Sequence, residues 1–324
     1  MQNHLSFSIL PESSFNKVDI KKIENSKKWS LHPFLSSNLS PKVLASIQRV
    51  GLLHPPIILQ TSTDKYQLLC GYSRLEAYKR TNPSKTSITC LILDKDTSSE
   101  QILHTVLEDQ LLSGSLSSIE KAYFFKYSLN YIEINEAAKN YLPILNEKIQ
   151  PHTIKKFFRL LELEQELQIS IHFGRINDKT AQELLSLTSS DRLTLHNIFL
   201  NLELGGGKQK RLLGLSKDLA YREGQTITEL LSGSDCKEIL THSEMNQPQK
   251  ISNLLTSLQK RLYPQSNSAE EVFLKKVHNM DLPASCSLTH SQAFEGDEVS
   301  LTIHFKDLLN VEKKLAEIKN IVKN

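Results

Sequence analysis

The stretch that decides the fold is Leu68-Leu69-Cys70-Gly71-Tyr72-Ser73-Arg74-Leu75-Glu76-Ala77. An apolar run ends at a glycine, and a polar pair, an arginine and a helical pattern follow, which predicts a strand, a tight turn and a helix. Gly71 can adopt backbone angles that other residues resist, and it lets a ligand approach the backbone closely. The first helical turn offers free N–H groups and Arg74 adds a planar cation, so this turn is a candidate anion-binding site.

Short strands and helices alternate on both sides of this turn. Ser40-Pro41 is a typical helix start, Gly51 a typical helix end, and Ser98 with Gln101 has the spacing of a capping box. The patterns predict strands at 18–20, 57–59, 66–70 and 87–93 and helices at 41–51, 73–80 and 98–112. We therefore expect a small α/β domain over residues 18–113, preceded by an N-terminal arm, residues 1–17.

From Gly114 to about Ser232 the apolar spacing is helical, which predicts an all-helical middle domain, residues 114–232. Two short helices, 133–141 and 151–161, suit a helix-turn-helix whose second helix reads DNA. No acidic residue stands between Glu147 and Glu162, which indicates a basic helix face. The candidate DNA-binding residues are His152, Thr153, Lys155, Lys156 and Arg159. The alternative is an ordinary solvated helix face.

The C-terminal third contains a linker with an amphipathic helix, residues 233–281, and a small α+β segment, residues 282–324. Apolar residues alternate from Val299 to Phe305, which predicts a strand of a hairpin, and residues 308–322 predict a helix. A hairpin and one helix enclose little core, so we expect self-association through this segment. Upstream, Gly205-Gly206-Gly207 fails the spacing of a phosphate loop and is interpreted as a flexible linker into a helix. The alternative is a loop that contacts the DNA backbone.

The composition excludes some classes of protein. The chain has 324 residues, a net charge of +3 and four scattered cysteines, Cys70, Cys90, Cys236 and Cys286. A charge this small does not by itself indicate nucleic-acid binding, so a DNA site must come from local clustering. The cysteines lack ligand spacing and no apolar run is long enough to span a membrane, so we expect reduced thiols, no structural metal and a cytoplasmic protein.

Five short blocks in order resemble the ParB family of chromosome and plasmid partition proteins. The family's patterns are SI…G, PI, GxRR, ENxxR and LSPIEEA, and the corresponding segments here are Ser46–Gly51, Pro56-Ile57, Gly71–Arg74, Glu108-Asp109 and Leu116–Ala122. Two later segments, 158–163 and 174–185, resemble the family's LRLLxLP and GKLSxGHARALL. The resemblance spans roughly residues 18–232.

This resemblance implies a pocket for cytidine triphosphate (CTP) and magnesium in the first domain. The implied nucleotide-binding residues are Gly71, Tyr72, Ser73 and Arg74, and the implied metal ligands are Glu108 and Asp109. Gly71 and Arg74 match the family, whereas Tyr72 and Ser73 replace its Glu and Arg. Asp109 replaces its Asn, and Ser113 stands near the position of a second missing arginine. These losses predict weak binding and slow or absent hydrolysis, so a weak CTPase is left open and no catalytic residue is assigned.

The resemblance further implies a dimeric protein that binds double-stranded DNA in partition, associates with the nucleoid and recruits a partition ATPase. The alternative is a nucleotide-independent helix-turn-helix transcription regulator with a vestigial CTP pocket. A nuclease is not expected, because no His-Asn-His pattern or acidic metal cluster stands in the sequence.

Overall fold

The computed structural model describes residues 13–25, 28–31, 41–112, 114–280, 282, 285–291, 298–305, 307 and 311, without the side chains of 266 and 267. The chain divides into two compact units, one ending at Lys210 and one beginning at Arg211. Each is described separately. Among the described residues, no helix is both long enough and apolar enough to span a membrane.

A five-stranded mixed sheet organises the first unit. Its strand order is β1-β5-β3-β4-β2. β1 is antiparallel to β5 and β3 is antiparallel to β4, whereas β3 is parallel to β5 and β2 is parallel to β4. The strands are β1 (Ser13–Asp19), β2 (Ile23–Glu24), β3 (Ile57–Ser62), β4 (Lys65–Cys70) and β5 (Ser87–Leu93), and a 3-10 turn, Ile20–Lys22, separates β1 from β2. The helices among them are α1 (Pro41–Val50), α2 (Tyr72–Thr81) and α3 (Ser99–Leu111).

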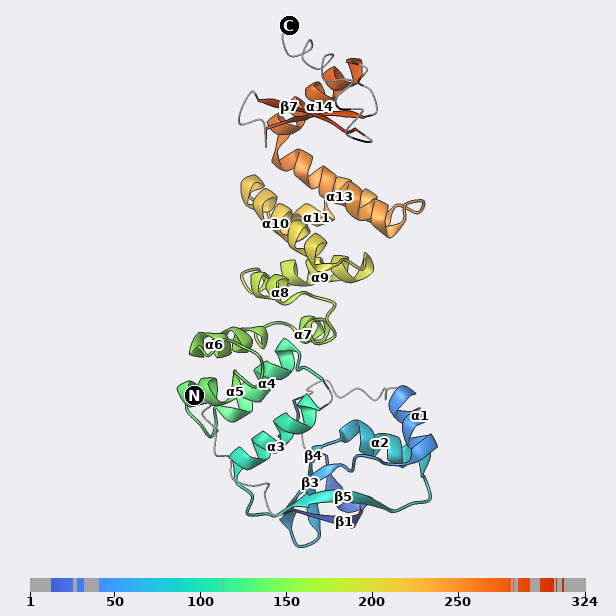
Figure 1. Ribbon diagram of the computed structural model, residues 1–324, viewed down its shortest axis with the longest axis vertical. Helices are drawn as coiled ribbons and strands as arrows, with labels where there is room; N and C mark the ends of the chain where they lie inside the picture. The colour runs from blue at the N-terminus through green and yellow to red at the C-terminus, as the bar shows by residue number, and fades with distance from the viewer. Residues whose placement is uncertain are drawn as a thin grey trace. The chain divides into compact units, whose positions relative to one another are not determined.

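Side chains of the strands alternate between two cores. Ile88 and Ile92 of β5 pack in one core with Leu75 of α2. Leu93 of β5 and Leu69 of β4 pack in the other core, which includes the buried face of α3. The period of two along each strand sends neighbouring residues to opposite faces. Helices α2 and α3 therefore cover opposite faces of the sheet (Figure 1).

The first strand begins earlier than the sequence suggests. We predicted an arm over residues 1–17 and a strand from residue 18, but β1 begins at Ser13. Most of its side chains are exposed, so it carries no apolar alternation. Its backbone is held by the antiparallel register with β5, from Ser13 opposite Leu93 to Asp19 opposite Ser87. Pairing with a distant strand supplied the hydrogen bonds that local pattern could not reveal.

A series of helices completes the first unit and continues the core of α3. Buried residues of α3 share one cluster with Phe124, Phe125, Tyr141 and Phe157 from the helices that follow. The sheet domain and these helices thus have a common core. The helices are α4 (Ser118–Ser128), α5 (Ile134–Tyr141), α6 (Pro151–Leu160), α7 (Gln165–His172), α8 (Asp178–Leu184) and α9 (Ser189–Asn201).

The triple glycine is not a flexible linker. Helix α10 (Gly206–Glu223) already includes Gly206 and Gly207, and the boundary between the two units falls inside it. A Cβ on Gly206 would lie 3.2 Å from the Cβ of Asn177, so the glycine permits close packing. The buried Gln209 then fixes the first turn by donating to the carbonyls of Leu204 and Arg175. Contacts distant in sequence overrode the low helix propensity of glycine.

The second unit contains helices and one hairpin. They are α11 (Ile227–Ser232), α12 (Ser234–Thr241), α13 (Gln247–Leu262), α14 (Pro264–Asn279), β6 (Cys286–His290) and β7 (Val299–Ile303). The predicted amphipathic helix is α13, which buries Ile251, Leu254, Leu255, Leu258 and Leu262. Sequence reasoning missed α14, and α12 begins where linker chemistry was expected, at Ser234. The hairpin is present as antiparallel β6 and β7. Most of the helix predicted at 308–322 lies outside the described residues.

Replacing Gly71 by alanine should destabilise the first unit more than replacing Gly51. Both glycines have positive φ, +91° and +77°, so both substitutions incur the left-handed strain of about 1–2 kcal/mol. A Cβ at residue 71 would also lie 3.1 Å from Pro56 Cα, whereas nothing lies within 4 Å at residue 51. We expect about 1–3 kcal/mol of additional loss for Gly71→Ala, measured by urea unfolding. Equal losses would show that Pro56 yields without cost.

Candidate nucleotide pocket and nucleic-acid interface

The predicted turn is built as a left-handed glycine between a strand and a helix. β4 ends at Cys70, Gly71 has φ +91°, and α2 begins at Tyr72. Leu75 N–H donates to the Gly71 carbonyl at 2.9 Å. The N–H groups before it, in the first turn of α2, have no acceptor within the helix. The sequence thus placed the glycine, the turn and Arg74 correctly within the fold.

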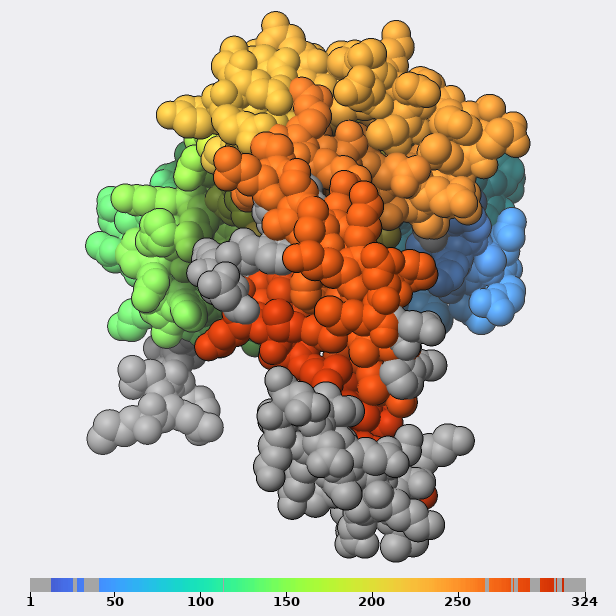
Figure 2. Space-filling view, turned by 90° about the horizontal axis from the view of Figure 1, so that it is seen from above, coloured from blue at the N-terminus to red at the C-terminus, as the bar shows by residue number. Residues whose placement is uncertain are grey.

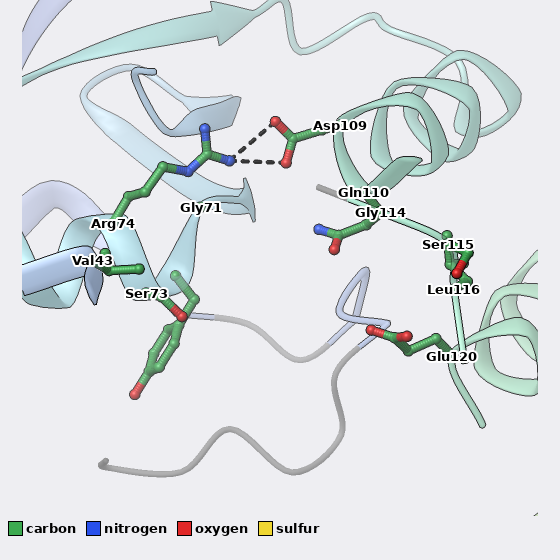
Figure 3. Close-up of a pocket in the computed structure, with 11 residues that line it drawn as sticks. Val43, Gly71, Ser73, Arg74, Asp109, Gln110, Gly114, Ser115, Leu116 and Glu120 are labelled. Atoms are coloured by element: carbon green, nitrogen blue, oxygen red, sulfur yellow. Dashed lines mark hydrogen bonds and ion pairs between the residues drawn. The ribbon is translucent and has the colours of Figure 1, made fainter. Parts of the chain in front are cut away.

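A cavity of about 450 Å³ opens beside this turn (Figure 3). Its size is within the range of small-molecule sites. All four residues predicted to bind nucleotide line it, together with Asp109, one of the two predicted metal ligands. The complete lining is Val43, Gly71, Tyr72, Ser73, Arg74, Asp109, Gln110, Gly114, Ser115, Leu116 and Glu120. Residues from α1, α2, α3, the segment after it and α4 therefore meet at one place.

Arg74 and Asp109 are bonded to each other. Arg74 Nη2 donates to Asp109 Oδ1 at 3.0 Å and to Oδ2 at 2.9 Å, as the dashed lines in Figure 3 show. Arg74 Nη1 donates to the carbonyl of His54 at 3.3 Å. The two charged side chains are only 25% and 14% exposed. The residue expected to bind phosphate and the residue expected to bind metal thus form one half-buried ion pair.

Cys70 lies beside this pair and stays a neutral thiol. Burial raises the pKa of the Cys70 thiol well above its usual value, and the nearby Asp109 carboxylate raises it further. Cys70 is 3% exposed. It contributes packing under the turn and no additional charge.

The other predicted metal ligand is placed differently. Glu108 is exposed on α3 and does not line the cavity. Its role as a metal ligand stays a prediction. Ser113, which stands near the position of a missing arginine, lies outside the described residues.

Helix α6 presents the predicted DNA-binding residues at the surface. His152, Lys155, Lys156 and Arg159 are exposed and Thr153 is half-buried, whereas the opposite face buries Ile154, Phe157 and Leu160. Helix α5 packs against α6. Lys121 of α4 pairs with Glu147 at 2.6 Å, in the connection that precedes α6. The carbonyl of Lys156 accepts from Gln182 Nε2 of α8 at 3.0 Å. The helix that carries the basic face is therefore held by contacts with its neighbouring helices.

Comparison with known proteins identifies the first domain. Residues 8–108 match the family described as ParB N-terminal domain. The chain is also 25% identical, over 211 residues, to the Probable chromosome-partitioning protein ParB of Borreliella burgdorferi, in an alignment that covers 64% of this chain and 70% of that protein. The first domain is a ParB N-terminal domain.

Two crystal structures of C-terminally truncated ParB from Caulobacter crescentus are distantly similar to this chain. One is complexed to the centromeric parS site and has 16% identity and a TM-score of 0.34, covering 61% of this chain and 98% of that chain. The other is complexed with CTP-gamma-S and has 16% identity and a TM-score of 0.24, covering 58% of this chain and 99% of that chain. The family assignment depends on the sequence match and not on these low structural scores.

Several cavity residues lie outside the match to the ParB N-terminal domain, which ends at residue 108. They include Asp109, Gln110, Ser115 and Glu120. Sequence reasoning did not assign Gln110, Ser115 or Glu120 to the site. Ser117 and Glu120 have capping-box spacing, which marks the start of α4 but does not by itself place Glu120 at the cavity. Gln110 and Ser115 have no comparable signal in the sequence.

The start of α4 connects the cavity to α7. Ser117 N–H donates to Glu120 Oε2 at 2.7 Å, and Glu120 N–H donates to Ser117 Oγ at 3.3 Å, which completes the capping box. Ser117 Oγ also shares a hydrogen bond of 2.9 Å with Nδ1 of His172, the last residue of α7. Since Glu120 lines the cavity, the same few groups border the cavity and fix two helices of the helical part.

Replacing Ser117 by alanine should cost more stability than replacing Ser98. Ser98 is the N-cap of α3 and forms an equivalent capping box with Gln101, but its hydroxyl has no histidine partner. Loss of an N-cap costs about 1 kcal/mol, and the hydrogen bond to His172 adds about 0.5–1.5 kcal/mol for Ser117→Ala. Urea unfolding of the two variants tests the difference. Identical losses would mean that the contact with His172 does not stabilise the fold.

Proposed function

We propose that this chain binds double-stranded DNA through α6 and acts in chromosome or plasmid partition. The observation that carries the proposal is the separation of faces on α6, with the basic side chains exposed and the apolar ones in the core. The ParB N-terminal domain and the similarity to a chromosome-partitioning relative support the same function. The family also implies a place at the nucleoid in the cytoplasm and a partner partition ATPase; foci of a fluorescent fusion away from the nucleoid would contradict that location.

In this proposal α5 and α6 form the helix-turn-helix, and α6 is the recognition helix. Lys155, Lys156 and Arg159 lie within about one turn of each other, so they can reach phosphates on one stretch of backbone. His152 and Thr153 stand near the N-terminus of α6, where a recognition helix contacts base edges. Lysine and arginine contacts with phosphate release counterions, so they give an affinity that falls with salt.

Replacing Lys155 and Lys156 by alanine should weaken duplex binding equally for all sequences. The slope of log affinity against log salt should fall by up to about 2, one for each lost phosphate contact. The matched control is Lys21→Ala with Lys22→Ala, an exposed Lys-Lys pair in the 3-10 turn between β1 and β2. Fluorescence anisotropy at several salt concentrations measures both. An unchanged slope in the α6 variant would remove α6 from the interface.

We further propose that the cavity binds CTP with Mg²⁺. The residues fit such a ligand, because the start of α2 and Arg74 supply donors for phosphate. Asp109, Gln110 and the hydroxyls of Ser73 and Ser115 supply oxygen donors of the kind that Mg²⁺ prefers. No group of three or more histidine, cysteine, aspartate or glutamate side chains forms a metal site within the described residues. Mg²⁺ needs only one or two carboxylates when phosphates complete its coordination.

Calorimetry with each of the four ribonucleoside triphosphates and Mg²⁺ should detect binding, with CTP the strongest ligand. Affinity should be modest, because Ser73 contributes no charge to the triphosphate. Phosphate release assayed in the same samples should be slow or absent. If none of the four nucleotides gives binding heat while DNA binding is intact, the nucleotide-independent transcription regulator would be favoured.

The C-terminal unit carries exposed apolar residues that fit self-association into a homodimer. Val272 and Leu274 of α14 are 53% and 55% exposed, and Val299 and Leu301 of β7 are 52% and 47% exposed. Figure 2 shows α14 and β7 in orange and red at the surface. Phe273 packs against His290 of β6, with ring centroids 4.9 Å apart, so α14 and the hairpin form one platform. Large apolar side chains this exposed are candidates for an interface.

Light scattering of the full chain should therefore give a mass near twice 36.9 kDa. Truncation after Ser232 removes α12–α14 and the hairpin, and should return the mass to that of a monomer. As a milder test, Leu301→Lys should weaken the dimer by placing a charge in the interface. A full-length monomer at high concentration would contradict the proposal.

A further inference from the structure

The ion pair in the cavity has a consequence for how a ligand can bind. A phosphate group that approaches the turn meets an arginine whose Nη2 is already bonded to both oxygens of Asp109. Its Nη1 donates to the carbonyl of His54. Both terminal nitrogens of Arg74 therefore have acceptors within the protein.

The charges that line the cavity do not favour a free anion. The ionised side chains of the lining are Arg74, with one positive charge, and Asp109 and Glu120, with one negative charge each. Their sum is one negative charge. In Figure 3 the Glu120 carboxylate lies across the cavity from the Arg74–Asp109 pair. A nucleoside triphosphate, which is itself strongly negative, would meet a neutralised arginine and an acidic wall.

The Asp109 carboxylate needs a cationic partner, because it is largely buried. It lies in the last turn of α3, where the helix dipole is negative, and its side chain is only 14% exposed. A half-buried carboxylate that loses its partner is costly. Asp109 can therefore release Arg74 only when another cation takes the place of the guanidinium. A hard divalent cation is suited to this, since Mg²⁺ binds carboxylate oxygen readily.

We propose that Asp109 is an internal competitor for phosphate on Arg74, and that nucleotide binds tightly only together with a divalent cation that draws Asp109 away. This inference rests on the proposed nucleotide site and adds its regulation. The exchange keeps both Arg74 and Asp109 paired, because Asp109 passes from Arg74 to the cation while Arg74 passes from Asp109 to the phosphate. The cation and the nucleotide are then coupled ligands, and each raises the affinity of the other by the same factor.

The test compares CTP binding by calorimetry with Mg²⁺ and with EDTA, in wild type, Asp109→Asn and Glu76→Gln. Asparagine keeps the shape of Asp109 and removes its charge. Glu76 is the matched control, because it is an acid on α2 that pairs with Lys79 at 2.6 Å and does not line the cavity. For wild type and Glu76→Gln we expect binding about 100-fold weaker in EDTA. For Asp109→Asn the ratio should fall to about tenfold, chiefly through tighter binding in EDTA; both factors are within the usual range of coupling between ligands.

An unchanged ratio in Asp109→Asn, with clear binding by wild type, would overturn the competition and leave the nucleotide site standing. Binding of no ribonucleoside triphosphate by wild type or Asp109→Asn would overturn both. A second measurement needs no variant: in wild type, saturating CTP must raise the affinity for Mg²⁺ by the factor by which Mg²⁺ raises the affinity for CTP, and by about 100-fold. A gain below tenfold would contradict the exchange.

Discussion

Helix α3 is packed on two sides, and the arrangement of the first unit depends on this packing. Its buried residues Ile102, Leu103, Val106 and Leu107 belong to a core that contains strand residues and the aromatic residues of α4 to α6. His104 of α3 and Tyr141 of α5 bring their ring centroids within 5.8 Å. A helix that is apolar on one face only could cover a sheet or join a bundle, but α3 does both. The sheet and the helices are thereby held as one body.

This shared core positions the residues of the cavity and of α6. Because the residues before Asp109 are fixed against the sheet, the end of α3 lies beside the turn at Gly71, and Arg74 can reach its carboxylate. The chain then continues through 114–116 into α4, whose capping box brings Glu120 to the same cavity. The proposed DNA-binding helix α6 contributes Ile154 and Phe157 to the core that includes α3. The cavity and the basic face are thus connected through one core of packed side chains.

Much of the local structure was predictable, because it depends on interactions between residues close in sequence. The capping box of Ser98 and Gln101, the end of α1 at Gly51 and the buried face of α13 all follow from spacings of three or four residues. The strand-turn-helix around Gly71 was predicted for the same reason. Where local signals were weak, prediction was wrong or incomplete. The first turn of α10 is helical despite its glycines, and α14 was missed because its side chains are largely exposed.

The sequence by itself determined the strand-turn-helix at Gly71 and the two faces of α6. Gly71 permits the positive φ, and Arg74 follows in the first helical turn. Helix α6 separates basic from apolar residues by its period of 3.6. Only the tertiary structure decided what Arg74 is bonded to, since Asp109 stands 35 positions along the chain. It also decided that β1 begins at Ser13, because a strand's hydrogen bonds come from its neighbour. Local pattern records the conformational preference of a segment, whereas the partner of a charge or of a strand is selected by packing across the whole unit.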